Sequence, residues 1–275
     1  MSELRIDPVF DAEFMSLPTD GWFDWSGGRG VDAEDWGAHA DLLVDGHLRF
    51  TVGAYLVRGG PVGDRVVLID AGVGPETNPD DLIPPGVLPD SLVALGVGPH
   101  EITDIVITHL HYDHTGWLAP GGAPFFERAT VHVPSADIAY FTDPASEGGS
   151  ARVTPGRLAA LGDRLRPFDA GETPVPGLDF VDAAGHTPGS TIVVASNGVR
   201  RVVFLGDVVH CPMQLVDADW AAMSDVDPVM ARRTRERVVQ ELDGAEVGAA
   251  HFPGLQLGRL LVSERPRQWL VSREV

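Results

Sequence analysis

Three histidines and one aspartate fall within six residues of one another, directly after an apolar run that predicts a buried strand. The run is Asp104–Thr108, and the chain continues His109-Leu110-His111-Tyr112-Asp113-His114. Imidazole and carboxylate groups are the ligands that Zn2+ and similar ions prefer. Side chains two residues apart on an extended chain point to one face. His109 and His111 should therefore meet one ion, while Asp113 and His114 should reach a second position beyond the turn.

Three residues later in the chain complete a candidate ligand shell. They are His186 in Gly185-His186-Thr187-Pro188-Gly189-Ser190, Asp207 in Phe204-Leu205-Gly206-Asp207, and His251 in Gly248-Ala249-Ala250-His251-Phe252-Pro253-Gly254. Each follows a short apolar run, and a rigid strand end holds a ligand in place better than a loose loop does. A nearby glycine lets the backbone turn sharply enough for each side chain to reach inward.

Short runs rich in Val, Ile and Leu alternate with turn clusters along the whole chain, which is typical of many short strands. The predicted strands are Leu48–Arg58, Arg65–Asp70, Asp104–Thr108, Thr130–Val133, Arg164–Phe168, Leu178–Asp182, Thr191–Ser196, Val202–Leu205 and Glu246–Ala249, with a closing hairpin Gly258–Ser263 and Gln268–Ser272 around Pro266. The predicted helices are Pro89–Leu95, Ser135–Phe141, Thr154–Leu161 and Pro228–Leu242. Ser135 and Asp227 are expected to cap the second and fourth helices.

The strands outnumber the helices, which favours sheets packed on each other with helices outside. No linker is long or polar enough to divide the chain, so residues 1–275 are expected to form one domain, with residues 1–43 as an N-terminal extension or loop. Residues 21–40 hold three of the six tryptophans, Trp22, Trp25 and Trp36, without helix or strand periodicity. This segment either packs its own aromatics onto the core or serves as a lid or a homodimer contact.

The order of these motifs resembles the metallo-β-lactamase superfamily, from about Val44 to the end of the chain. The resemblance implies an α+β fold, an αββα sandwich with a metal site at the sheet edge. It also implies the ligand sets. One ion is held by His109, His111 and His186, and the other by Asp113, His114 and His251. Asp207 bridges the two ions, and a hydroxide lies between them. Seven ligands exceed what one tetrahedral zinc uses, so we expect two divalent ions, Zn2+ first, with Mn2+, Co2+ or Fe2+ as alternatives.

Individual residues and segment lengths of the chain indicate which branch of the superfamily it resembles. Asp207 occupies a position where one type of β-lactamase has cysteine, and only about 24 residues follow His251, too few for the helical domain of glyoxalase II enzymes. The segments Leu205–His210, 224–228 and Gly248–Gly254 are similar to the branch of lactonases and methyl parathion hydrolase. This resemblance implies a hydrolase that opens lactones or cleaves carboxylic esters. Organophosphate triesters, and after them β-lactams, are the alternative substrates, and a redox or binding member of the fold is a third class.

Several residues receive expected roles from this resemblance. Asp113 and Asp207 are the catalytic carboxylates; Asp113 binds the hydroxide and returns a proton to the leaving group. Asp70 orients a ligand histidine. His210 either donates a hydrogen bond to the substrate or is a packed loop histidine. Trp22, Trp25 and Trp117 are expected to set acyl-chain preference if they line the pocket. Four residues after the ligand cluster either wall an apolar pocket or, for at least two of them, pack in the core: Trp117, Leu118, Phe125 and Phe126.

The remaining histidines and the arginines of the last helix are expected to be structural. The histidines without ligand neighbours are His39, His47, His100 and His132. The arginines expected on a solvated helix face are Arg232, Arg233, Arg235 and Arg237.

The charge of the chain excludes several function classes. The net charge is −20 and none of the 20 basic residues is a lysine, so a Schiff-base lysine enzyme and a P-loop NTPase are ruled out. An acidic surface repels phosphate backbones, which disfavours nucleic acid and favours a neutral small-molecule substrate. The single cysteine, Cys211, allows no intrachain disulfide. No signal peptide or membrane-spanning run is visible, so a cytoplasmic protein without a membrane partner is expected.

Overall fold

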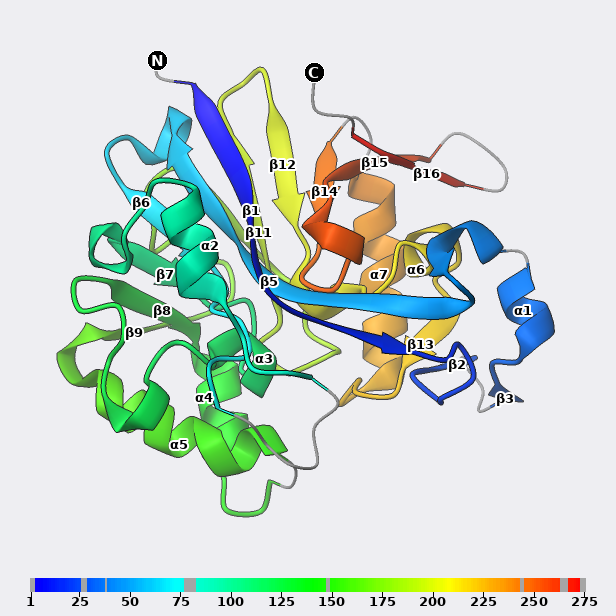
Figure 1. Ribbon diagram of the computed structural model, residues 1–275, viewed down its shortest axis with the longest axis horizontal. Helices are drawn as coiled ribbons and strands as arrows, with labels where there is room; N and C mark the ends of the chain where they lie inside the picture. Colours follow the sequence, from blue (N-terminus) through cyan, green and yellow to red (C-terminus); the bar gives the residue numbers. More distant parts are fainter. Residues whose placement is uncertain are drawn as a thin grey trace.

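The first of two stacked sheets is built mostly from the N-terminal half of the chain (Figure 1). The structure is a computed structural model, and it describes residues 3–25, 29–37, 39–76, 83–146, 149–242, 245–262 and 267–272. Its strand order is β1-β5-β6-β7-β8-β9, with β4 also paired to β5. The strands are β1 (Leu4–Ser16), β4 (Leu43–Val44), β5 (His47–Gly59), β6 (Val66–Ile69), β7 (Asp104–Val106), β8 (Thr130–Pro134) and β9 (Leu165–Phe168). Strands β6 to β9 run parallel to one another.

The second sheet comes from the C-terminal half and has the order β10-β11-β12-β14-β15-β16. Its strands are β10 (Leu178–Asp182), β11 (Thr191–Ser196), β12 (Arg201–Phe204), β14 (Glu246–Gly248), β15 (Gly258–Leu261) and β16 (Gln268–Val271). Strands β12 and β14 are its one parallel pair among the described residues. A third, small sheet has the order β13-β2-β3 and joins β13 (Trp220–Ala222), β2 (Phe23–Trp25) and β3 (Arg29–Gly30).

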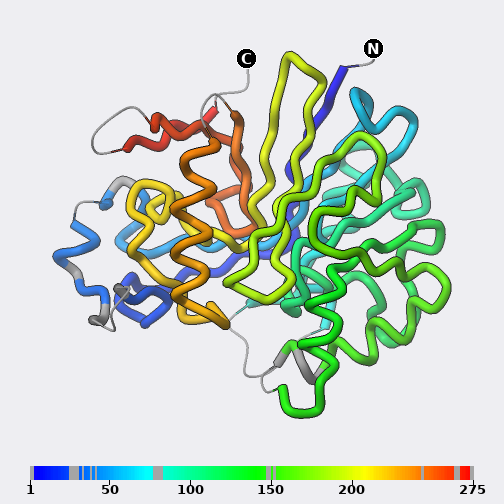
Figure 2. The backbone as a smooth tube through the Cα atoms, turned by 180° about the vertical axis from the view of Figure 1, so that it is seen from behind, coloured from blue at the N-terminus to red at the C-terminus, as the bar shows by residue number. Residues whose placement is uncertain are grey.

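The two large sheets face each other across an apolar layer, and helices cover their outer faces. Val57 and Ile69 of the first sheet share this layer with Val193 and Phe204 of the second. The helices over the first sheet are α2 (Leu88–Ala94), α4 (Ser135–Thr142) and α5 (Gly149–Leu161). Helix α7 (Pro228–Glu241) covers the second sheet. Figures 1 and 2 show these helices on opposite sides of the sheets, which confirms the expected αββα sandwich.

The predicted strands agree with the observed ones to within one or two residues. The turn of the predicted closing hairpin, residues 263–266, lies outside the described residues. The Asp227 carboxylate accepts from the Met230 N–H at 2.9 Å and caps α7 as predicted. The cap predicted at Ser135 is wrong: Pro134 precedes the helix and no side chain caps it. Among the described residues, no helix is long and apolar enough to cross a bilayer.

The expectation that residues 1–43 form an extension or loop is wrong for residues 4–16, which form the thirteen-residue strand β1. Strand β1 pairs antiparallel with β5 along its whole length, with a bulge between Phe10 and Ala12. Strand β1 contains Pro8, whose missing N–H is tolerated because β1 lies at the sheet edge. The bulge shifts the inward-outward alternation, so the strand lacks the simple period that a sequence pattern can reveal.

The buried carboxylate of Asp11 at this bulge ties β1 to the loop that follows β6. It accepts hydrogen bonds from the backbone N–H groups of Val73 and Leu88 and from the Trp117 indole. A Cβ at Gly72, where φ is +57°, would lie 2.1 Å from the carboxylate. Glycine is therefore required there, because both the backbone conformation and the close approach exclude a side chain. Ile83, the first residue described after position 76, borders the cavity described below.

Candidate metal centre

The seven candidate ligands meet at one edge of the sandwich because the strands that precede them end there. His109 and His111 follow β7, and Asp113 and His114 lie in the short helix α3 (Tyr112–Thr115). His186 lies in the turn between β10 and β11. Asp207 and His251 follow the parallel strands β12 and β14, whose carboxyl ends open at the same edge. Both sheets thus contribute to one cluster.

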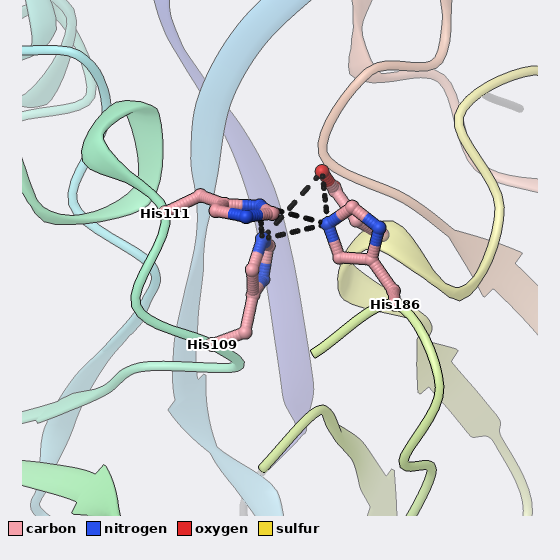
Figure 3. A group of neighbouring side chains, drawn as sticks. His109, His111 and His186 are labelled. Carbon is pink, nitrogen blue, oxygen red and sulfur yellow. Dashed lines mark hydrogen bonds and ion pairs between the residues drawn. The ribbon is translucent and has the colours of Figure 1, made fainter. Parts of the chain in front are cut away.

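The first ligand group consists of His109, His111, His186 and Asp207, with ligand atoms all within 4.8 Å of one another. The Nε2 atom of His186 lies 2.8 Å from His111 Nδ1 and 3.2 Å from His109 Nε2, and these two atoms are 3.0 Å apart. Figure 3 shows the three rings pointing toward one another. Asp207 Oδ2 lies 3.5 Å from His186 Nε2 and 3.6 Å from His109 Nε2. Three nitrogens and one carboxylate therefore surround one point.

The second group consists of Asp113, His114 and His251. His251 Nε2 lies 3.4 Å from Asp113 Oδ2, and His114 Nε2 lies 3.9 Å from the same oxygen. Asp207 also contacts this group, with 3.3 Å from Oδ1 to His114 Nε2 and 3.2 Å from Oδ2 to His251 Nε2. Asp207 is thus the residue that lies between the two groups.

Both histidine rings of the second group are oriented from behind by an acceptor. His114 Nδ1 lies 3.0 Å from an Asp70 carboxylate oxygen, and His251 Nδ1 lies 3.1 Å from the Thr51 carbonyl. Those contacts place the proton on Nδ1 and leave a lone pair on Nε2 facing the cluster. Asp70, held at φ +65°, also accepts from the Thr108 N–H and hydroxyl. Its position behind a ligand ring is the one expected from the sequence.

The rings of His109 and His186 are oriented in the same way, by partners of their Nδ1 atoms. The Thr108 hydroxyl donates to Asp70, so it can accept from His109 Nδ1 at 3.2 Å. His186 Nδ1 lies 3.1 Å from Asp225 Oδ1. His109 and His186 are therefore held with bare Nε2 atoms directed at each other.

This arrangement fits divalent cations. Bare ring nitrogens 2.8–3.2 Å apart repel unless a cation or a proton lies among them. In the second group, His114 Nε2 and Asp207 Oδ1 are buried without a hydrogen-bond partner among the described residues. Buried polar atoms are rarely left unpaired. Imidazole nitrogens with carboxylate oxygens are the donor set of Zn2+ and its neighbours, so the residues present suit metal ions at both groups.

The electrostatics differ between the two groups. Burial, together with neighbouring imidazoles, holds the pKa values of His109 and His111 well below their ordinary value. At His114, burial lowers the pKa but Asp207, Asp70 and Asp113 outweigh it, so the pKa lies well above its ordinary value. The pKa of His251 is raised in the same way, because the charges of Asp207 and Asp113 outweigh the effect of burial. The second group therefore holds protons near neutral pH when no cation is bound.

We expect Zn2+ binding to the metal-free protein to release protons, because ligand histidines must be neutral. The raised pKa values place these protons on His114 and His251, so the apparent Zn2+ affinity should rise with pH until both are neutral. Titration calorimetry in buffers of different ionisation enthalpy measures the protons released. A His114→Gln variant should release about one proton fewer, and the remote His47→Gln control should match the parent. Equal proton release by His114→Gln and the parent would contradict this assignment.

Arg235 corrects the expectation of a solvated arginine face on α7. It is fully buried, and its Nη1 lies 3.1 Å from Asp225 Oδ2. Burial raises the pKa of Asp225, but the hydrogen bond from His186 and the charge of Arg235 outweigh burial and hold the pKa below its ordinary value. Arg235, Asp225 and His186 thus form a buried chain that ends on a candidate ligand. Arg232 and Arg233, in contrast, lie at the surface as predicted.

A signal for Arg235 existed in the sequence. The buried residues of α7 recur at helical spacing, and position 235 falls within that inner stripe: Ala231, Thr234, Arg235, Val238 and Val239. Asp225 and the capping Asp227 have different partners: the Asp225 carboxylate contacts Arg235 and His186, whereas the Asp227 carboxylate accepts from the Met230 N–H.

His210 lies beside the cluster but outside both ligand groups. Its Nε2 is 3.3 Å from Asp207 Oδ2 and 3.4 Å from the Ser224 hydroxyl. Its ring stacks on His251 with centroids 5.6 Å apart. Burial lowers its pKa despite the charge of Asp207, so the ring is neutral near pH 7. It also borders the cavity over the cluster.

A cavity of about 320 Å³ opens over the ligand groups. Its floor contains the candidate ligands His111, Asp113, Asp207 and His251, together with His210. Its walls are mostly apolar: Phe14, Trp22, Phe23, Phe50, Ile83, Tyr112, Ser150, Ala222 and Ser224. No arginine is among the described residues that line it. The cavity therefore suits an uncharged, largely apolar molecule.

The aromatic residues at the cavity are only partly those expected. Trp22 lines it, packed 5.4 Å from the Phe14 ring and 5.1 Å from the Phe50 ring, centroid to centroid. The side chain of Trp25 lies outside the described part of the structure. Of the two roles expected for the four residues after the histidine cluster, the pocket wall is wrong and core packing is confirmed. They pack in the core between the first sheet and its helices: Trp117, Leu118, Phe125 and Phe126.

The other histidines lie away from the cluster. His132 Nε2 contacts Asp104 Oδ1 at 3.0 Å inside the first sheet, and the His39 ring packs against Trp220. None of the four histidines expected to be structural falls in either ligand group.

Comparison with known proteins supports this arrangement. Residues 49–251 match the family model of the Metallo-beta-lactamase superfamily. Acyl-coenzyme A thioesterase MBLAC2 of Gallus gallus is 30% identical over 195 residues, which cover 62% of this chain and 61% of that protein. The Homo sapiens protein of the same name is 26% identical over 210 residues, covering 69% of this chain and 67% of that protein. The chain thus matches less than two thirds of the first relative.

Two solved structures resemble the fold along nearly its full length. AidC, a dizinc quorum-quenching lactonase in complex with a product, has a TM-score of 0.85 at 22% identity and covers 99% of this chain and 96% of that one. Hydrolase AbOPH has a TM-score of 0.84 at 22% identity and covers 99% and 95%. At this identity the likeness establishes the architecture.

Proposed function

Because the chain belongs to the metallo-beta-lactamase superfamily, we propose that it is a hydrolase that opens lactones or cleaves carboxylic esters. The observation that carries the proposal is the cavity over the two ligand groups, whose lining, as far as the structure describes it, is mostly apolar and contains no arginine. A neutral acyl substrate can enter it and bring its carbonyl to the cluster. The dizinc lactonase AidC, which shares the fold, supports both the substrate class and zinc as the first metal to test.

The two ligand groups support a proposal of two divalent ions. One would be held by His109, His111 and His186 and the other by Asp113, His114 and His251, with Asp207 between the two groups. When bound, such ions lower the pKa of water toward neutrality and polarise a carbonyl oxygen. Ions loaded onto the metal-free protein should approach two per chain in elemental analysis. A second ion that never binds at saturating metal would overturn the two-ion assignment.

The chain's own residues handle the proton and the substrate. Asp113 Oδ2 borders the cavity and lies 3.4 Å from His251 Nε2, so it can take the proton that water loses on attacking the acyl carbon. As the C–O bond breaks, the same oxygen returns that proton to the leaving alkoxide. Neutral His210, beside Asp207 and Ser224, offers a hydrogen bond at the cavity floor. The aromatic wall excludes water from the acyl side.

Thioester hydrolysis is a second candidate, because the two relatives described above are named acyl-coenzyme A thioesterases. A coenzyme A substrate carries several negative charges, whereas this chain has a net charge of −20. The described lining of the cavity offers no basic side chain to bind those phosphates. We therefore rank neutral esters and lactones above acyl-coenzyme A.

The expected result of a substrate panel follows from this charge. Lactones and aryl esters should show a kcat/KM at least about tenfold above acyl-coenzyme A and phosphodiesters, a difference of about 1.4 kcal/mol. Paraoxon-type triesters should fall between, since they are neutral but need a different transition-state geometry. The panel also includes a chromogenic β-lactam, and chelator-treated protein is the control. Faster turnover of acyl-coenzyme A, or of a phosphodiester or RNA, than of every lactone and ester would overturn the proposal.

A further inference from the structure

The Asp137 carboxylate of α4 contributes no ligand, yet it joins the two loops that carry the first ligand group. Its Oδ2 accepts from the Leu110 N–H at 2.8 Å and from the Thr187 hydroxyl at 3.0 Å. Its Oδ1 accepts from the Gly189 N–H at 2.6 Å. Leu110 stands between His109 and His111, and Thr187 follows His186. The carboxylate is fully buried.

These contacts cross between the two halves of the molecule. The His109–His111 loop follows β7 of the first sheet, whereas the His186 loop joins β10 and β11 of the second. The rings shown in Figure 3 therefore meet across a junction between two sheets, not along one element. A Cβ at Gly189 would lie 2.8 Å from the Asp137 carboxylate and from its backbone nitrogen, so the loop is packed directly against the helix.

We propose that Asp137 is a positioning residue that sets the spacing of His109, His111 and His186 by clamping their two loops to one carboxylate. This inference rests on the proposed metal-dependent function, because the spacing matters only if these histidines hold an ion. Partners around metal ligands commonly change metal affinity by about 10–100-fold when removed.

The chemistry of the contacts requires a carboxylate. The Leu110 and Gly189 backbone N–H groups can only donate, and they approach different oxygens of Asp137. An asparagine would turn its NH2 group toward one of these donors in either orientation, and so would lose one of the two backbone contacts. Thr187→Val removes a single contact to the same carboxylate without a change of charge.

The test is Zn2+ affinity by competition with a chromophoric chelator, using the full-length chain. For Asp137→Asn we expect one of the two ions to bind about 10–100-fold more weakly, with the other ion within about threefold of the parent. Thr187→Val should weaken the same ion to a smaller extent. In a His186→Ala background, Asp137→Asn should add little further loss, because that ligand set is already broken. The Co2+ absorption spectrum should change for Asp137→Asn in its ligand-field bands.

Asp104→Asn is the matched control. Asp104 is also buried in the first sheet and accepts from Arg65 and His132, but it touches neither ligand loop. It should leave both Zn2+ affinities unchanged even if the metal-free protein melts at a lower temperature. Unchanged affinities and Co2+ spectra in Asp137→Asn and Thr187→Val, beside a parent that binds two ions, would overturn the clamp. An equal loss in Asp104→Asn would also overturn it, because the effect would be general destabilisation. A parent that binds no ion would instead refute the proposed function.

Discussion

Replacing Asp207 with alanine should reduce ester or lactone turnover at least about a thousandfold, equivalent to about 4 kcal/mol in the barrier. Asp207 lies between the two ligand groups. Burial raises the pKa of its carboxyl, but His251, His114 and other imidazoles outweigh burial, so the pKa lies well below its ordinary value. Its charge therefore offsets the charge that gathers at the cluster. The fold should persist, because Asp207 lies in a turn after β12 and pairs with no strand. Far-ultraviolet circular dichroism and the panel assay measure the two effects.

Two further variants sharpen this test. Asp207→Cys should also lose most activity, because a thiolate changes the reach and the softness of the bridging ligand. Asp179→Ala is the matched control, since Asp179 is exposed on β10. If the activity of Asp207→Ala stayed within about tenfold of that of the parent, Asp207 would have only a structural role in its turn.

The second large effect is expected at Arg235. Arg235→Met should lower the free energy of unfolding of the metal-free protein by about 3–5 kcal/mol, because it leaves the buried Asp225 charge uncompensated. Chemical denaturation measures the change. Arg232→Met on the same helix is the matched control. Its partners are Asp219 and Glu236 at the surface, so its loss should stay within about 1 kcal/mol.

A double variant separates stability from function. Adding Asp225→Asn to Arg235→Met removes the unpaired charge, and should recover much of the lost stability. It should not restore Zn2+ affinity, because a neutral amide orients His186 less strongly than the carboxylate does. Full recovery of both properties would show that the Arg235–Asp225 chain has no role at the ligand.

The ligand segment His109–His114 was predictable because its residue types and spacing can be read from a few neighbouring positions. The segment His109–His114 places four ligand-type side chains within a few residues, and strand alternation says which two face together. The later residues His186, Asp207 and His251 were identified by their order and by the strands before them. The strands that were predicted lie close to their observed bounds, since they are apolar runs between turn residues, whereas β1 and β4 of the first sheet were missed.

What the sequence left open depends on contacts between distant segments. Strand β1 is stable only because β5 lies beside it, and its edge position and bulge hide the pattern of a strand. The cavity wall joins Phe14 and Trp22 to Phe50 through that same pairing and through β2. Trp117, which stands beside the ligands in the sequence, packs in the core between the first sheet and its helices and does not line the cavity.

The sequence by itself determined the ligand types, their order and the layered fold, because side-chain chemistry and hydrophobic period are properties of short segments. Only the tertiary structure decided which groups support the ligands and what fills the space over them. Asp137, Asp225 and Arg235 are ordinary polar residues until folding buries them. A buried polar group must then find a partner, and here those partners are the loops and rings of the metal centre.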